Sequence, residues 1–387
     1  MHTIKTYSKQ TYNAMKKTFI LATIALIFNT TSCKSQIYSP EDEQLRKEIG
    51  QMLLVGFRDT ELQTGSSIYR DITEYNIGGV ILFEYDAPSQ SRPRNINSRL
   101  QLQKLCKDLQ QLANGNLIIS IDQEGGKVNR LKNQYGFPRF ISAQEMGIEN
   151  DPDTTIFYAN RTAKTLNSMG INVNFAPCVD INSNPSCPII GKLGRSFSAD
   201  PDMVIKHASM WIEEHSRNNV ISVIKHFPGH GSSKNDTHLG IADISSSWTE
   251  NELIPFQYFI DLKMVDAIMT SHVFNANIDS VFPATLSYNT LTNLLRNTMK
   301  FEGVIITDDL AMGAMVQHYS LEQMLELAIL AGADMLCLSN NGNNYDPNIV
   351  PKAVEIIYNK VINGNISRER ITESYNRIQQ LKDKHLQ

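Results

Sequence analysis

Residues 220–231 read VISVIKHFPGHG, an apolar run that ends abruptly in a lysine, a histidine and a glycine-rich turn. A short run dominated by Val and Ile, without alternating polar residues, is typical of a strand that is buried on both faces of a parallel sheet. Ionisable residues placed directly after such a strand lie at its carboxyl end. The segment therefore predicts a buried strand that delivers chemically active groups to one edge of a sheet.

Seven further runs share this layout. In chain order the eight runs span 52–57, 79–83, 117–121, 173–176, 220–224, 267–269, 304–306 and 335–338. Segments with apolar residues at three- and four-residue steps lie between them, such as 154–169, 201–217 and 320–331. Strands that alternate with amphipathic helices build βαβ units, and eight units predict an α/β fold, a single (β/α)8 barrel of the TIM type. Residues 367–384 are predicted to form a helix that closes the ring.

A doubly wound open sheet is the alternative fold, but no GxGxxG loop follows the first run, 52–57. The chain ends soon after the eighth run. We therefore expect a single barrel domain over 37–387, with no second α/β sandwich domain after it.

Composition narrows the class of protein. Hydrophobic residues make up 41% of the 387 residues and charged residues 20%, which excludes disorder, collagen and a polytopic membrane protein. Lys and Arg number 36 against 40 Asp and Glu, and this lack of a basic surplus argues against a nucleic-acid binder. We expect a monomer.

The N-terminal segment has the layout of an export signal. Residues 15–36 read MKKTFILATIALIFNTTSCKSQ, in which two lysines precede an apolar run too short to span a bilayer. Cys33 follows this run as in bacterial lipoproteins, so we expect it to carry lipid, with a plain secretory signal as the alternative. Residues 1–36 are then a leader, Met15 is a possible start, and the protein is an exported lipoprotein anchored to a membrane, on the periplasmic or outer-membrane side.

The other cysteines, Cys106, Cys178, Cys187 and Cys337, form no CxxC pair. They are expected to be small buried hydrophobes rather than disulfide partners. Only Cys178 and Cys187 are near enough in sequence for a disulfide to be considered.

Polar residues gather where the middle runs end. The residues concerned are Asp122 and Glu124, Asp180, Lys225 and His226, Ser271 and His272, and Thr307, Asp308 and Asp309. In a (β/α)8 barrel all strands open on the same mouth, which holds the active site. A structural protein would have little use for so many ionisable groups there, because each costs desolvation energy unless it is paired.

Asp308 and Asp309 supply a candidate nucleophile. Neighbouring strand residues point to opposite sides, so one carboxylate can face the mouth while the other faces the helices. A single inward carboxylate, kept ionised by Lys225, could attack a substrate.

The segment 225–238 supplies a candidate proton donor. Asp236 and His238 are two residues apart in a loop rich in Gly and Ser, and the carboxylate could orient and charge-stabilise the imidazole. The alternative is a zinc site of His226, His230, Asp236 and His238, whose geometry a Pro/Gly loop does not preset. We predict no metal and no cofactor.

Asp122, Arg130 and Arg195 are candidate ligand-binding residues. Asp122 and Arg130 flank a Gly-Gly turn, and Arg195 stands in a Gly-Arg-Ser-Phe segment. Charged groups of this kind bind hydroxyls with directed hydrogen bonds. Surface ion pairing is the alternative for each residue taken alone.

Four motifs together resemble glycoside hydrolase family 3, in its β-N-acetylglucosaminidase (β-hexosaminidase) branch. They are IDQEGGKVNR at 121–130, KHFPGHG at 225–231, DTH at 236–238 and ITDDLAM at 306–312. The resemblance covers about 49–381. Departures are small: Lys127 stands where Arg is more frequent, and Thr307 where Ser is common.

The resemblance implies roles for these residues. Asp308 would be the nucleophile, His238 the general acid/base and Asp236 its partner. The hydroxyls of a terminal N-acetylglucosamine would be held by Asp122, Arg130, Arg195, Lys225 and His226. The chain would then be a retaining exo-acting β-N-acetylglucosaminidase that releases terminal β-linked N-acetylglucosamine from peptidoglycan fragments, chitin oligosaccharides or other glycans.

Several alternatives stay open. A phosphorylase or a β-glucosidase could use the same scaffold, and a histidine acid/base tolerates an anionic acceptor such as phosphate better than a carboxylate would. A non-catalytic sugar-binding surface lipoprotein would lack the nucleophile or a member of the dyad, yet all three residues are present. A metallohydrolase would be inactivated by chelators.

Overall fold

The computed structural model describes residues 39–237 and 240–386. Cys33 and His238 lie outside the described residues, so what the sequence predicts for them stays a prediction. By its internal contacts the chain separates into two units, Met1–Glu43 and Gln44–Gln387. The fold described below is that of the second unit. Within the described ranges, no helix is long and apolar enough to cross a membrane.

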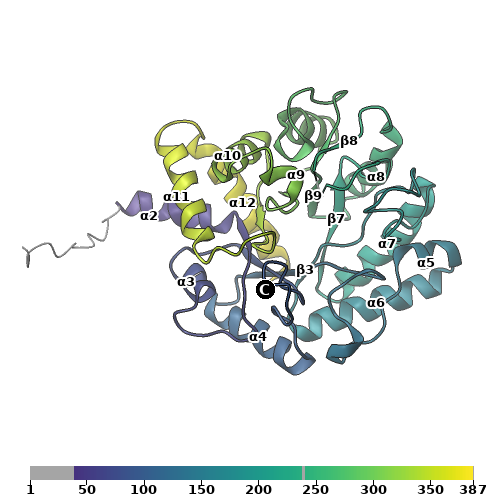
Figure 1. Cartoon of the computed structure of the whole chain (residues 1–387), viewed down its shortest axis with the longest axis horizontal. Helices are drawn as coiled ribbons and strands as arrows, with labels where there is room; N and C mark the ends of the chain where they lie inside the picture. Colours follow the sequence, from purple (N-terminus) through teal and green to yellow (C-terminus); the bar gives the residue numbers. More distant parts are fainter. Residues whose placement is uncertain (1–38, 238–239, 387) are drawn as a thin grey trace, which may run out of the picture. The chain divides into compact units, whose positions relative to one another are not determined.

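Eight parallel strands form the central sheet, with helices around them (Figure 1). Their order is β11-β9-β7-β6-β3-β2-β1-β12. A parallel bridge from Ile306 to Met335 joins the two ends of this order, and the Thr307 amide donates to the Met335 carbonyl at 2.9 Å. The sheet therefore closes, and the predicted (β/α)8 barrel is confirmed. The strands are β1 (Leu53–Gly56), β2 (Gly79–Leu82), β3 (Ile118–Ile121), β6 (Val173–Asn174), β7 (Ile221–Phe227), β9 (Ala267–Thr270), β11 (Val304–Ile306) and β12 (Leu336–Leu338).

Helices follow the strands in sequence, and their ends carry the expected capping residues. Ser98 and Ser320 form capping boxes with Gln101 and Gln323, and Gly170 ends a long helix in the left-handed conformation. The helices are α2 (Pro40–Gln51), α3 (Ser67–Thr73), α4 (Arg99–Leu112), α5 (Ala143–Glu149), α6 (Pro152–Met169), α7 (Pro201–Arg217), α8 (Ile254–Asp261), the π-helix η4 (Asn289–Thr298), α9 (Gly313–Val316), α10 (Leu321–Ala331), α11 (Ile349–Ile362) and α12 (Arg368–His385).

The core lies between the strands and the helices that surround them. Ile119, Val223 and Ile268 on the strands, and Trp211 on α7, are buried in one continuous apolar cluster. Burying such a side chain contributes about 1.5–3 kcal/mol, which explains why the strands read as continuous apolar runs. The closing helix α12 adds Ile371 and Ile378 to the same cluster, as the sequence predicts.

One strand is longer than the sequence suggests. The apolar run ends at Ile224, but β7 continues through Lys225 and His226 to Phe227, with a shift of register against β9. The extension is possible because the Lys225 ammonium is paired with two carboxylates, of Asp122 and Glu124, so a charged residue can stay in the strand.

The four described cysteines are buried and free. The possible Cys178–Cys187 disulfide is therefore absent from the described part of the chain, and both residues pack with Ile189 and Ile190 in a small apolar cluster.

Candidate active site

Asp308 and Asp309, which follow β11, have different surroundings. The Asp309 carboxylate accepts a hydrogen bond from the amide of Ser339, the residue after β12, at 2.9 Å and another from the nearby Ala311 amide at 3.1 Å. The half-buried Asp308 carboxylate accepts from the Asp309 amide at 2.7 Å. Asp309 is thus occupied by the fold, which leaves Asp308 as the candidate nucleophile.

The charge state of Asp308 suits a nucleophile. Burial by itself raises the pKa of its carboxyl group, but His272, His226, the Asp309 amide and Lys225 together hold this pKa below its usual value. For Asp309 burial prevails and its pKa is raised. At neutral pH Asp308 is therefore an anion, the form that can attack an anomeric carbon.

Lys225 stands between two carboxylates, those of Asp122 and Glu124, which directly follow β3 in the sequence. Its ammonium lies 2.7 Å from Oδ1 of Asp122 and 2.7 Å from Oε1 of Glu124, and its side chain is 2% exposed. Burial lowers the pKa of Lys225, but the two carboxylates more than compensate, so that this pKa is raised. The same contacts lower the pKa of Asp122 against the effect of its burial. All three groups are charged across the physiological range.

Arg195 extends this network across the barrel mouth. Its guanidinium binds Glu124 with two hydrogen bonds, at 2.9 Å and 2.7 Å, and its Nη2 lies 3.0 Å from Nε2 of His226. Bidentate pairs of this type fix orientation as well as charge. Arg130 lies farther out, with Nη2 3.6 Å from Oδ2 of Asp122. The structure therefore brings Asp122, Arg130, Arg195, Lys225 and His226 into one connected cluster.

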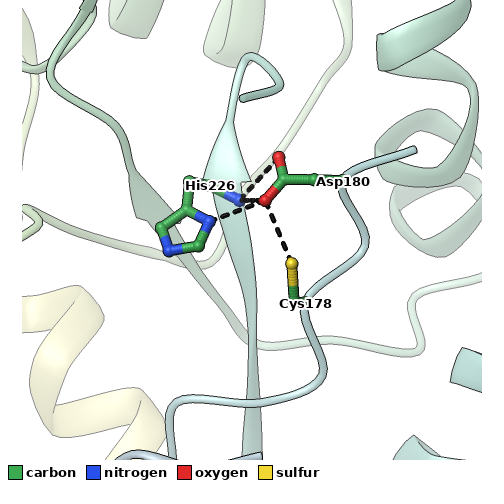
Figure 2. Close-up of side chains that lie close together, drawn as sticks. All are labelled: Cys178, Asp180 and His226. Carbon is green, nitrogen blue, oxygen red and sulfur yellow. Dashed lines mark hydrogen bonds and ion pairs between the residues drawn. The ribbon is translucent and has the colours of Figure 1, made fainter. Parts of the chain in front are cut away.

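The His226 ring is held from its other side by Asp180 (Figure 2). Nδ1 of His226 lies 2.6 Å from Oδ2 of Asp180, and the Cys178 thiol donates to the same oxygen at 3.1 Å. In the described part of the chain these three residues are the ones whose ligand atoms gather closely enough to suggest a metal. Each atom already has a hydrogen-bond partner, and the Arg195 cation lies beside the ring, so the cluster is better explained as a hydrogen-bonded pair with a thiol.

The zinc site considered from the sequence would use His226, His230, Asp236 and His238. Its described members do not come together as a group of metal ligands. Nε2 of His230 lies 3.3 Å from the Thr237 hydroxyl, and the ring of His230 meets the ring of His226 edge to face. Burial lowers the pKa of His230 to about 4, so this imidazole is neutral. His230 acts within the loop as a hydrogen-bond partner of Thr237.

The loop that carries Asp236 is tied to the segment that follows Asp308. The Thr237 carbonyl accepts a hydrogen bond from the Ala314 amide at 3.0 Å, and Ala314 lies in α9, six residues after Asp308. Asp236 itself is half-buried. The described part of the loop therefore reaches the same side of the barrel as the candidate nucleophile.

Four residues of the site received no role from the sequence. Glu124 is the shared partner of Lys225 and Arg195, although its position two residues after Asp122 could have indicated that both face the same way. Asp180 and His272 were predicted only as polar residues at strand ends. The hydrogen bond of 2.9 Å between Nδ1 of His272 and the Thr285 hydroxyl is a tertiary contact, which no pattern in the sequence indicates. The fourth residue is Glu252.

Glu252 is a buried carboxyl group beneath the loop that follows β7. Its Oε2 accepts from the Gly231 amide at 3.1 Å, and its Oε1 has no partner among the described atoms. Burial raises its pKa to about 7, with Asp180 adding to the effect and hydrogen bonds from Gly231 and Ser232 opposing it.

Glu252→Gln is expected to flatten the dependence of stability on pH. Because the folded-state pKa is raised, the stability that Glu252 contributes is full below about pH 4.5 and is lost as the pH rises through about 7. The shift corresponds to a free energy on the order of 3 kcal/mol. Urea unfolding should show that the free energy of unfolding of the variant rises relative to that of the wild type by about this amount between pH 5 and pH 8. Free energies that change with pH in parallel for the two proteins would contradict the prediction.

Comparison with known proteins agrees with the motifs. The model of the glycosyl hydrolase family 3 N terminal domain matches residues 44–381. A β-hexosaminidase of Tolumonas auensis is 36% identical over 273 residues, which are 68% of this chain and 76% of that protein. β-Hexosaminidase A of Pseudoalteromonas piscicida is 31% identical over 337 residues, 81% of this chain and 54% of its own length.

Among solved structures, a family 3 β-N-acetylglucosaminidase from Paenibacillus sp. str. FPU-7 superposes with a TM-score of 0.79 at 33% identity. The match covers 88% of this chain and 62% of that one. The chain thus spans little more than half of some of its relatives. The matched region contains the barrel and the charged cluster at its mouth, and the chain therefore belongs to glycosyl hydrolase family 3, in its β-N-acetylglucosaminidase branch.

Proposed function

We propose that the protein is a retaining exo-acting β-N-acetylglucosaminidase. The observation that carries the proposal is the ionised Asp308 at the barrel mouth, beside a cluster of fixed charges that includes Lys225 and Arg195. Relatives that bear the names β-hexosaminidase and β-N-acetylglucosaminidase match over the same region. Fixed donors and acceptors in this cluster suit the hydroxyl groups of a sugar.

In the first step an Asp308 oxygen attacks the anomeric carbon while the bond to the leaving oxygen breaks. His238 gives its proton to that oxygen, and a covalent glycosyl-Asp308 intermediate forms through an oxocarbenium-like transition state. In the second step His238 takes a proton from water, whose oxygen attacks the same carbon and releases Asp308. Two inversions leave the β configuration of the sugar unchanged. Asp236 orients His238 and stabilises its charged form.

His238→Ala is expected to separate substrates by their leaving groups. Nitrophenol needs little protonation, so turnover of its N-acetyl-β-glucosaminide should change by less than about tenfold in the glycosylation step. A disaccharide with an alcohol leaving group should be cleaved about 10²- to 10⁴-fold more slowly, the range for loss of general acid catalysis. The kcat/KM values for both substrates, which report the glycosylation step alone, measure the difference. An equal loss of kcat/KM on both would show that His238 is not the general acid.

The class of reaction is tested by one set of assays on wild-type enzyme. Nitrophenyl N-acetyl-β-glucosaminide should be turned over faster than the plain glucoside, and inorganic phosphate should leave the product and its rate unchanged. Faster cleavage of the glucoside would assign a β-glucosidase. A sugar phosphate formed only with phosphate present would assign a phosphorylase.

The natural substrate is proposed from the expected location. An exported enzyme anchored through Cys33 would meet peptidoglycan fragments or environmental chitin and glycans, which end in β-linked N-acetylglucosamine.

A further inference from the structure

Asp180 lies outside the cluster of proposed sugar-binding residues yet contacts it through His226. It is fully buried, between β6 and α7, and 46 residues away from His226 in sequence. A buried carboxylate costs several kcal/mol in desolvation unless its oxygens are satisfied. A carboxylate buried at this position is therefore expected to have a specific role.

Both oxygens of Asp180 are fully used. Oδ1 accepts from the His230 amide at 2.8 Å, and the His226 amide lies 3.2 Å from each oxygen. Oδ2 accepts in addition from the His226 ring and the Cys178 thiol (Figure 2). These contacts lower the pKa of Asp180 to about 2 in spite of its burial, with the His226 ring as the strongest of the opposing influences. Asp180 is a permanent acceptor.

A permanent acceptor at Nδ1 decides which nitrogen of His226 carries the proton. Nδ1 lies 2.6 Å from the carboxylate and must donate to it. Nε2 lies 3.0 Å from Nη2 of Arg195, a group that can only donate, so Nε2 must accept. Both contacts therefore place the proton on Nδ1 and leave Nε2 as the acceptor. The same ring then holds Arg195, which is also bound to Glu124.

We propose that Asp180 is a positioning residue, which sets the tautomer of His226 and, through that ring, the orientation of Arg195 at the sugar-binding cluster. The expected effect on catalysis rests on the proposed function. The tautomer of His226 does not, because it is set by contacts within the protein. Cys178 contributes little, because its thiol is one of several donors to Asp180 and touches neither His226 nor Arg195 in the contacts observed.

Asp180→Asn tests this role with little change in shape. The amide oxygen can keep the two backbone amides, and the NH2 group then faces Nδ1 of His226 and donates to it. The ring must carry its proton on Nε2, opposite the Arg195 guanidinium, where two donors meet. We expect kcat/KM to fall about 10- to 100-fold, as is typical when the outer partner of an orienting histidine is lost, with a higher KM as well as a lower kcat.

The decisive readout is nitrogen NMR of protein labelled in histidine, with the His226 signals assigned by their absence in His226→Gln. In the wild type Nδ1 should be protonated and Nε2 unprotonated, and in Asp180→Asn the two should exchange. Cys178→Ala is the matched control and should keep the wild-type tautomer and kcat/KM within about twofold. A wild-type ring protonated on Nε2 would overturn the inference, even if the Asn variant did not fold. So would an Asn variant with wild-type kinetics.

Failure of the proposed function would look different. It would leave the wild type without glycosidase turnover while the Nδ1 proton on His226 was still observed.

Discussion

Asp308→Ala should be devoid of measurable turnover, with kcat lowered at least about 10⁴-fold, the scale on which loss of a nucleophile acts. Asp309 cannot replace it, because its carboxylate is bound to Ser339 and Ala311. Binding of free N-acetylglucosamine should persist, since Lys225 and Arg195 keep their own carboxylate partners without Asp308. Steady-state kinetics and calorimetric titration measure the two effects.

Asp308→Asn is the matched control for shape. It keeps the acceptor for the Asp309 amide and removes the charge, so it should fold like the wild type and be as inactive as the alanine variant. Activity of either variant within about tenfold of the wild type would exclude Asp308 as the nucleophile.

Lys225→Met is expected to have the largest effect on stability. The change leaves Asp122 and Glu124 without the ammonium that lies 2.7 Å from each of them. Removing one member of a buried ion cluster costs about 3–5 kcal/mol, because the remaining charges stay buried. Activity should be lost as well, since the variant also lacks a cation beside Asp308. Urea unfolding of wild type and variant measures the loss.

The effect of Lys225→Met should depend on pH. In the wild type the pKa of Asp122 is lowered, so its contribution to stability is present above its unfolded-state pKa and lost as the pH falls through the folded-state value. Without Lys225 that contribution shrinks, so the difference in stability between the two proteins should be full above about pH 4 and should narrow as the pH falls below that value. Lys104→Met is the control: Lys104 is exposed on α4 and pairs with Asp108, and an exposed ion pair of this kind contributes little to stability. If Lys225→Met lost as little stability as Lys104→Met, the proposed stabilising role of Lys225 would be contradicted.

The sequence predicted the barrel well because its strands are buried on both faces. Each apolar run became a strand, and the amphipathic segments at 201–217 and 367–384 became helices at nearly the predicted bounds. One clear difference, the extension of β7 to Phe227, arises where Lys225 is neutralised by residues about 100 positions earlier. Local sequence carries no information on that pairing.

The candidate site was predicted in composition but not in connectivity. Strand-end position placed Asp122, Lys225 and Asp308 at the mouth, because parallel strands share their carboxyl ends. The partnership of Asp180 with His226 and the central place of Glu124 depend on which side chains meet across the barrel. Such contacts follow from the closed fold and not from spacing along the chain.

Trapping the glycosyl-enzyme tests the central claim most directly. A slowly released fluorinated N-acetylglucosaminyl substrate, incubated with wild-type protein and followed by proteolysis and peptide mass spectrometry, should place one sugar on the peptide that contains Asp308. Fragmentation should locate the sugar on Asp308 and not on Asp309, and His238→Ala should still form the adduct from an activated donor. A sugar on any other residue, or turnover with inversion and no adduct, would contradict the mechanism.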